Sequence, residues 1–163
     1  MSSNPYAPPK AFVADIATQE DSPPLWNPNA AANWSLLFSP AFGAFLHMKN
    51  WEDLGEPEKA AAAKVWVIVS LVLLLCLPVL AVLVPGFSGL QNISRLFGLV
   101  LLISWYSTSG RPQARYVKER FGKNYPRKGW GKPLLIAFVA VIGYFFVVGI
   151  LAAILVGVTG RVG

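Results

Sequence analysis

Two long runs of apolar residues constrain this chain more than any other feature of its sequence. Residues 65–84 (VWVIVSLVLLLCLPVLAVLV) form a run of 20 without a charge, and residues 133–158 (PLLIAFVAVIGYFFVVGILAAILVGV) form one of 26. At about 1.5 Å per helical residue, each run can cross the roughly 30 Å hydrocarbon core of a bilayer. A buried core helix is the alternative. A chain of 163 residues, 55% apolar and 13% charged, has too little other material to surround both runs. The sequence therefore predicts two membrane-spanning helices.

Two weaker apolar segments precede these runs, one before each. Residues 30–48 carry no charge but are diluted by polar and small side chains, and residues 86–107 carry Arg95 close to their middle. The order is therefore weak segment, polar linker and strong run, twice over. This order is typical of a duplicated helical hairpin.

A shared phrase supports the duplication. Residues 39–57 and 94–112 match at six positions when aligned at an offset of 55, and both end in a Gly-X-Pro sequence that begins at Gly55 or Gly110. Glycine can adopt the left-handed cap after a helix, and proline cannot continue that helix. Each Gly-X-Pro is therefore expected to end one helix and begin the next. Coincidence in a chain rich in Phe, Gly, Leu and Ser is the alternative.

These patterns predict an all-α integral membrane bundle with about four membrane-embedded helices, arranged as two tandem hairpins. A flexible, proline-rich tail (1–29) is followed by a first hairpin (30–85) and a second hairpin (86–163). The second hairpin contains a basic loop (108–132). In the alternative arrangement, one or both weak segments are re-entrant or lie in the membrane interface.

The distribution of Lys and Arg predicts the orientation of the chain. Residues 111–132 hold eight basic residues and one acid, Glu119, whereas the turn at residues 85–90 holds no charge. Basic loops stay on the cytoplasmic side of a membrane. The basic loop is therefore expected in the cytoplasm and the C-terminus in the periplasm of a bacterial inner membrane, while the side of the N-terminus depends on whether residues 30–48 cross.

The basic loop is also the first candidate binding site. Basic side chains near an anionic leaflet gain about 1 kcal/mol each, and aromatic rings favour the headgroup region. We therefore expect contact with the lipid bilayer and its anionic headgroups or with a protein partner, while no nucleic-acid-binding motif accompanies the charge. The expected contact residues are Arg111, Arg115, Lys118, Arg120, Lys123, Arg127, Lys128, Trp130 and Lys132.

Arg95, with Asn92 nearby, is a possible intramembrane polar site. An arginine at mid-helix depth costs about 2.5–3.5 kcal/mol on insertion scales, so such residues face a polar cavity, pair with another group or extend to the interface. An anion or headgroup site is one interpretation of this pair. The other is that Arg95 marks the outer interface, since the preceding GFSGLQNIS is polar and turn-like.

Small residues at a spacing of four predict close helix packing. Gly149, Ala153 and Gly157 lie on one face of the last run, and Ser35, Ser39 and Gly43 have the same spacing in the first weak segment. Such faces let two backbones approach closely in lipid. We expect the two faces to pack together, within one chain or between two copies.

The sequence holds no phosphate-binding glycine loop, nucleophile elbow, metal-ligand motif or paired catalytic carboxylates. We therefore predict no catalytic residues, no metal and no cofactor. The stretches NPYAPP at the start, WNPN at 26–29 and WSLLFSP at 34–40 resemble small polytopic bacterial inner-membrane proteins that carry no known activity. We expect a non-enzymatic protein that binds a partner, as an accessory subunit, a scaffold or a toxin-immunity protein, or that forms a homo-oligomer. The alternative is a small channel or transporter whose repeats line a path near Arg95.

Overall fold

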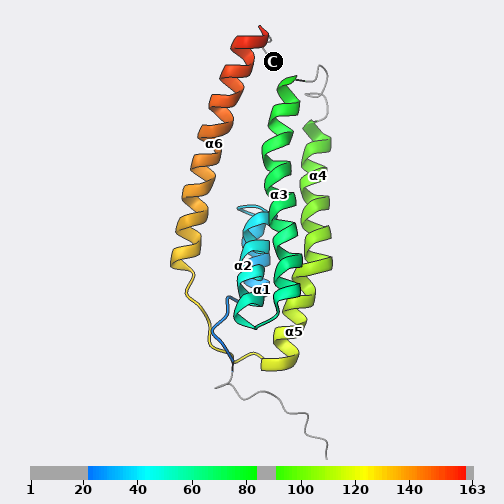
Figure 1. Ribbon diagram of the computed structural model, residues 1–163, viewed down its shortest axis with the longest axis vertical. Coiled ribbons are helices and arrows are strands. Elements are labelled where there is room, and N and C mark those ends of the chain that lie inside the picture. Colours follow the sequence, from blue (N-terminus) through cyan, green and yellow to red (C-terminus); the bar gives the residue numbers. More distant parts are fainter. Residues whose placement is uncertain (1–21, 84–90, 161–163) are drawn as a thin grey trace, which may run out of the picture.

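The protein is an elongated, all-helical bundle, which confirms the all-α part of the predicted fold (Figure 1). The computed structural model describes residues 22–83 and 91–160, and the side chains of 22–80, 96–158 and 160. No strand occurs in these ranges beyond an isolated bridge between Leu25 and Arg127. The elements are α1 (Pro28–Ser35), α2 (Pro40–Asp53), α3 (Pro57–Leu83), α4 (Gln91–Trp105), the π-helix η3 (Tyr106–Gly110), α5 (Arg111–Phe121) and α6 (Gly131–Thr159).

Two helices, α3 and α6, are long and apolar enough to cross a membrane. Their large apolar side chains point outward: Ile136, Phe145 and Phe146 of α6 are 69%, 67% and 69% exposed. In water such exposure would oppose folding, whereas in lipid it costs little. The four embedded helices expected from the sequence are not confirmed, because α4 has 15 residues and α1 and α2 are shorter still.

The first weak segment folds into two short helices. The Asn27 side chain caps α1 by accepting from the backbone N–H groups of Asn29 and Ala30, and Pro28 begins that helix. The chain then turns at residues 36–39, and Pro40 begins α2. The start of α1 lies beside the last turns of α2, because the Pro28 carbonyl is 3.1 Å from Nε2 of His47. Both ends of the segment therefore lie at the same end of the bundle, next to the half of α3 nearest α5 (Figure 1).

The two Gly-X-Pro sequences have different structures. Gly55 has a φ of +70° and ends α2 before α3 begins at Pro57, as expected. Gly110 has helical angles, φ −68° and ψ −53°, and the chain runs from α4 through η3 into α5 without a stop. The prediction of a helix end at Gly110 is wrong. In η3 the Arg111 N–H donates to the Tyr106 carbonyl five residues earlier, and this wider turn accommodates the missing N–H and the ring of Pro112.

Helix α3 lies between α4 and α6 (Figure 1). Helix α6 packs on α3, where the Tyr144 hydroxyl donates to the Leu74 carbonyl at 3.0 Å. Helices α4 and α6 lie on different sides of α3. They therefore do not form the second hairpin expected from the sequence.

The segment before α1 is bound to the basic loop. The Leu25 N–H donates to the Pro126 carbonyl at 3.0 Å, and the Lys128 N–H donates to the Leu25 carbonyl at 2.9 Å. The Leu25 side chain is fully buried against Val117 and Phe121 of α5. Residues 22–29, which we expected within the flexible tail, are therefore packed, and residues 1–21 of that tail lie outside the described part of the chain.

Candidate functional site: a basic groove where the apolar helices end

A buried polar network holds α2, α5 and the N-terminal segment together. Asn50 accepts from the Trp26 N–H at 3.0 Å and donates to the Trp26 carbonyl at 2.8 Å. Asn50 also donates to Oε1 of Gln113 at 3.3 Å, and Gln113 donates to the His47 carbonyl at 2.8 Å. Asn50 and Gln113 are fully buried. Because these amides are paired, they fix the position of α5 relative to α2 instead of weakening the core.

His47 completes this network on the side facing α4. It is fully buried, and its ring packs edge-on against Trp105 with 5.3 Å between centroids. Burial lowers the pKa of His47 to about 4, although its contact with the Pro28 carbonyl acts in the opposite direction. The imidazole is therefore neutral at neutral pH. Packing against Trp105 and the hydrogen bond with the Pro28 carbonyl account for its position.

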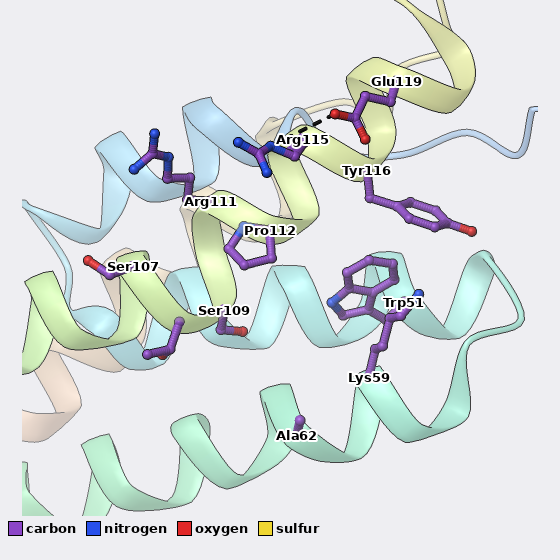
Figure 2. Close-up of a pocket in the computed structure, with 11 residues that line it drawn as sticks. Trp51, Lys59, Ala62, Ser107, Ser109, Arg111, Pro112, Arg115, Tyr116 and Glu119 are labelled. Carbon is purple, nitrogen blue, oxygen red and sulfur yellow. Dashed lines mark ion pairs between the residues drawn. The ribbon is translucent and has the colours of Figure 1, made fainter.

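A groove of about 640 Å³ opens between α3 and the η3–α5 segment, with α2 behind it (Figure 2). Lys59 and Ala62 lie just before the apolar run of α3, and residues 107–109 lie just after the apolar part of α4. Two separate helices thus place the groove at the boundary between apolar and polar parts of the molecule. The lining residues are Trp51, Lys59, Ala62, Ser107, Thr108, Ser109, Arg111, Pro112, Arg115, Tyr116 and Glu119.

The groove carries an excess of positive charge. Its charged side chains are the cations Lys59, Arg111 and Arg115 and the single acid Glu119, a net charge of +2. Arg115 and Glu119 are 3.8 Å apart and both well exposed, which makes a weak pair. Arg111 has no carboxylate partner among the residues whose side chains are described.

Aromatic rings hold the third cation, Lys59, at the inner wall. Its ammonium lies 4.4 Å from the Tyr116 ring centroid and 4.9 Å from that of Trp51, and 3.2 Å from Oε2 of Glu56. The Tyr116 hydroxyl donates to Oε1 of Glu56 at 2.9 Å and accepts from Arg120 at 2.8 Å. The Tyr116 hydrogen bond, with help from Lys59, lowers the pKa of Glu56 below its usual value. These contacts keep the wall in one arrangement before any ligand binds.

Hydroxyl groups line the η3 side of the groove. The Thr108 hydroxyl donates to the Ser104 carbonyl at 2.7 Å and is therefore occupied. The hydroxyls of Ser107 and Ser109 make no hydrogen bond within the described part of the protein, so each is free to donate to a ligand.

Only Arg111 and Arg115 of the nine expected contact residues line this groove. Lys128 forms an ion pair with Asp53 and lies 4.4 Å from the Trp26 ring centroid, and Trp130 packs against Trp34. Arg120 bonds to Tyr116, Arg127 donates to the Lys123 carbonyl, and Lys118, Lys123 and Lys132 are exposed. The structure thus divides the predicted site into a groove and an outer basic surface.

Sequence reasoning missed Trp51, Lys59, Tyr116 and the serines of η3 as parts of one site. A local signal did exist, because Arg111, Arg115 and Glu119 recur at a spacing of four and share a helix face. Trp51 and Lys59 lie more than 50 residues away in the sequence from Arg111 and Arg115. Only the packing of α2 and α3 beside η3 and α5 brings Trp51 and Lys59 to these arginines.

The other predicted site, Arg95 with Asn92, lies outside the residues whose side chains are described. The two small-residue faces do not meet within the chain. A Cβ atom added to Gly149 or Gly157 would have nothing within 4 Å, whereas one added to Gly43 would collide with Ser35 and Trp105. Ala153 is exposed, and its neighbour Ala152 instead faces α3. Packing of the α6 face in a second copy stays a prediction.

Comparison of the chain with protein-family models, curated proteins and solved structures gives no match.

Proposed function

We propose that this chain is an integral protein of a bacterial inner membrane that acts by binding a protein partner and catalyses no reaction. An accessory subunit, a scaffold and a toxin-immunity protein are the roles that fit. The main support for partner binding is the outer basic surface, formed by Lys118, Lys123 and Lys132. These lysines pair with no carboxylate among the described side chains. The buried Asn50–Gln113 network and the Leu25 bridge hold that surface in place. A rigid, unpaired basic surface suits an acidic partner, since little conformational freedom is lost on binding.

The arrangement of the helices supports three membrane crossings and a re-entrant hairpin. In this topology α3, α4 with η3, and α6 cross, while α1 and α2 enter and return on one side. The exposed Leu36 and Leu37, 68% and 73% accessible, lie at the tip of that hairpin and would contact lipid. The positive-inside rule puts the basic loop in the cytoplasm. The N-terminal segment, which is bonded to that loop, is then also cytoplasmic, and the C-terminus is periplasmic.

The alternative function, a channel or transporter with a path near Arg95, has less support. The hollow between α3 and α6 is lined by apolar side chains such as Leu75, Val79 and Leu151 and measures about 10 Å³. That volume is at the lower limit for holding a single water molecule, so the described side chains leave no water path between α3 and α6. The Arg95 side chain, on α4, lies outside those described and gives the alternative no observed contact. The partner-binding function therefore has more support than a channel or transporter.

Partner binding can be tested by purifying the protein in a mild detergent and identifying co-purifying proteins by mass spectrometry. The test variant replaces Lys118, Lys123 and Lys132 with Gln, and the control replaces the half-buried Lys49 and the exposed Lys64, two other lysines of the same half of the molecule. We expect one partner in a fixed ratio with the wild type and the control, and its loss with the test variant. A solitary monomer, or ion flux through liposomes containing the pure protein, would contradict the proposal.

A further inference from the structure

The groove lies at the boundary between the apolar and polar parts of the helices that line it. On the side of the groove toward the C-terminal end of α3, the exposed side chains are apolar. Val65 of α3 is 58% exposed, and Ile103 of α4 is 62% exposed. The groove itself starts at Lys59 and Ala62 on α3 and at Ser107 on η3. In a membrane crossed by α3, it therefore lies where hydrocarbon gives way to headgroups. Tryptophan and tyrosine favour this level, and Trp51 and Tyr116 form its wall.

The groups in the groove are those that recognise a phosphate. Two guanidinium groups one helical turn apart, Arg111 and Arg115, offer planar donor forks that match phosphate oxygens. Ser107 precedes Arg111 by the same spacing of four, and its free hydroxyl can donate to the same oxygens, whereas the Ser109 side chain points the opposite way (Figure 2). Glu119 at 3.8 Å holds Arg115 only weakly, so the guanidinium can turn to a ligand at small cost.

We infer that this groove binds the phosphate-bearing headgroup of an anionic phospholipid. Arg111 and Arg115 contact the phosphate, Ser107 donates to its oxygens, and the acyl chains continue along the exposed apolar side chains of α3 and α4. A net charge of +2 favours a headgroup with a negative charge over a zwitterionic one. The inference rests on the proposed membrane insertion, but it requires no protein partner.

A soluble phosphate anion offers the same oxygens as a phospholipid headgroup. The apolar surface next to the groove distinguishes these two ligands. The exposed Val65 follows the groove residue Ala62 by about one turn of α3, and the exposed Ile103 of α4 precedes the groove residue Ser107 by about one helical turn. A soluble phosphate gains nothing from that surface, whereas a lipid buries its chains there. The structure therefore favours the lipid.

The inference can be tested by native mass spectrometry of the detergent-purified protein titrated with phosphatidylglycerol or phosphatidylcholine. The groove variant is Arg111→Gln/Arg115→Gln, and the control is Lys49→Gln/Lys64→Gln, which removes the same charge near the same boundary without lining the groove. We expect one tightly held phosphatidylglycerol on the wild type. The groove variant should bind it about 30-fold more weakly, because each arginine that contacts the phosphate contributes about fivefold. The control should lose less than about threefold, because Lys49 and Lys64 do not line the groove.

A second variant keeps the test valid if the arginine variant fails to fold. Ser107→Ala leaves every charge in place and should weaken phosphatidylglycerol binding by about threefold for the lost hydrogen bond, whereas Ser109→Ala should leave it unchanged. Equal binding of phosphatidylglycerol and phosphatidylcholine, or equal losses in the groove variant and the control, would overturn the inference. So would displacement of the bound species by millimolar inorganic phosphate. Recovery of the protein in the soluble fraction would instead refute membrane insertion, so the two failures can be told apart.

Discussion

Replacing Gly43 by alanine tests the packing of the α1–α2 hairpin against α4. A Cβ atom at this position would lie 2.0 Å from Oγ of Ser35 and 2.5 Å from Cη2 of Trp105. Neither neighbour can move freely, because the Ser35 hydroxyl donates to the Ala31 carbonyl at 2.9 Å and Trp105 is fully buried. Gly43→Ala should therefore force the hairpin away from Trp105.

The expected loss follows from three contributions. Overpacking of a filled core costs about 1–3 kcal/mol, and the loss of the buried Ser35 hydrogen bond adds about 1 kcal/mol. Alanine in a helix recovers up to about 1 kcal/mol relative to glycine. The net loss is about 1–3 kcal/mol, which corresponds to a fall in melting temperature of roughly 3–10 °C for a chain of this size.

Gly98 provides a matched control, because it occupies the corresponding position of the second sequence copy. A Cβ atom at Gly98 would have nothing within 4 Å. Gly98→Ala should therefore leave the melting temperature unchanged or raise it slightly. Tryptophan fluorescence of the purified protein during heating is a suitable assay, since Trp105 lies at the site of the change. Equal melting temperatures for the two variants would refute the reasoning.

Two further predictions concern pH and topology. The pKa of His47, about 4 in the folded protein, lies below its ordinary value of about 6.5, so the unfolded chain binds the proton more readily. The free energy of unfolding should fall by about 3 kcal/mol as the pH is lowered from about 6.5 to 4, and His47→Gln, which removes the only histidine, should remove most of that slope and leave the smaller part due to Glu56. Urea unfolding at a series of pH values measures this, and an equal slope in both proteins would argue against it. In a Cys76→Ser background, single cysteines at Ser2 and Lys123 should resist an impermeant thiol reagent in intact cells, while one added after Gly163 should react. Labelling at Ser2 but not at Lys123 would mean that the first segment crosses the membrane.

The boundaries of individual helices could be predicted only where one local rule dominates. Pro28, Pro40 and Pro57 each begin a helix, and Gly55 ends one, because their backbone preferences act without help from distant residues. The same pattern at Gly110 misled the prediction. There α5 buries Gln113, Val117 and Phe121 against the rest of the molecule, and this packing is compatible with a helix that continues through a π turn.

The sequence by itself determined that two helices can cross a membrane, since a run of 20 or more apolar residues needs only its own length and composition to do so. It also determined that basic residues cluster in one loop. Only the tertiary structure decided that residues 30–48 fold back as two helices, because that depends on contacts such as those of His47 with Pro28 and Asn50 with Trp26. It alone decided which cations share a groove, since Lys59 and Arg111 meet only through the packing of α3 beside η3 and α5. Membrane insertion is a property of one segment, whereas a binding site requires segments distant in the sequence to come together.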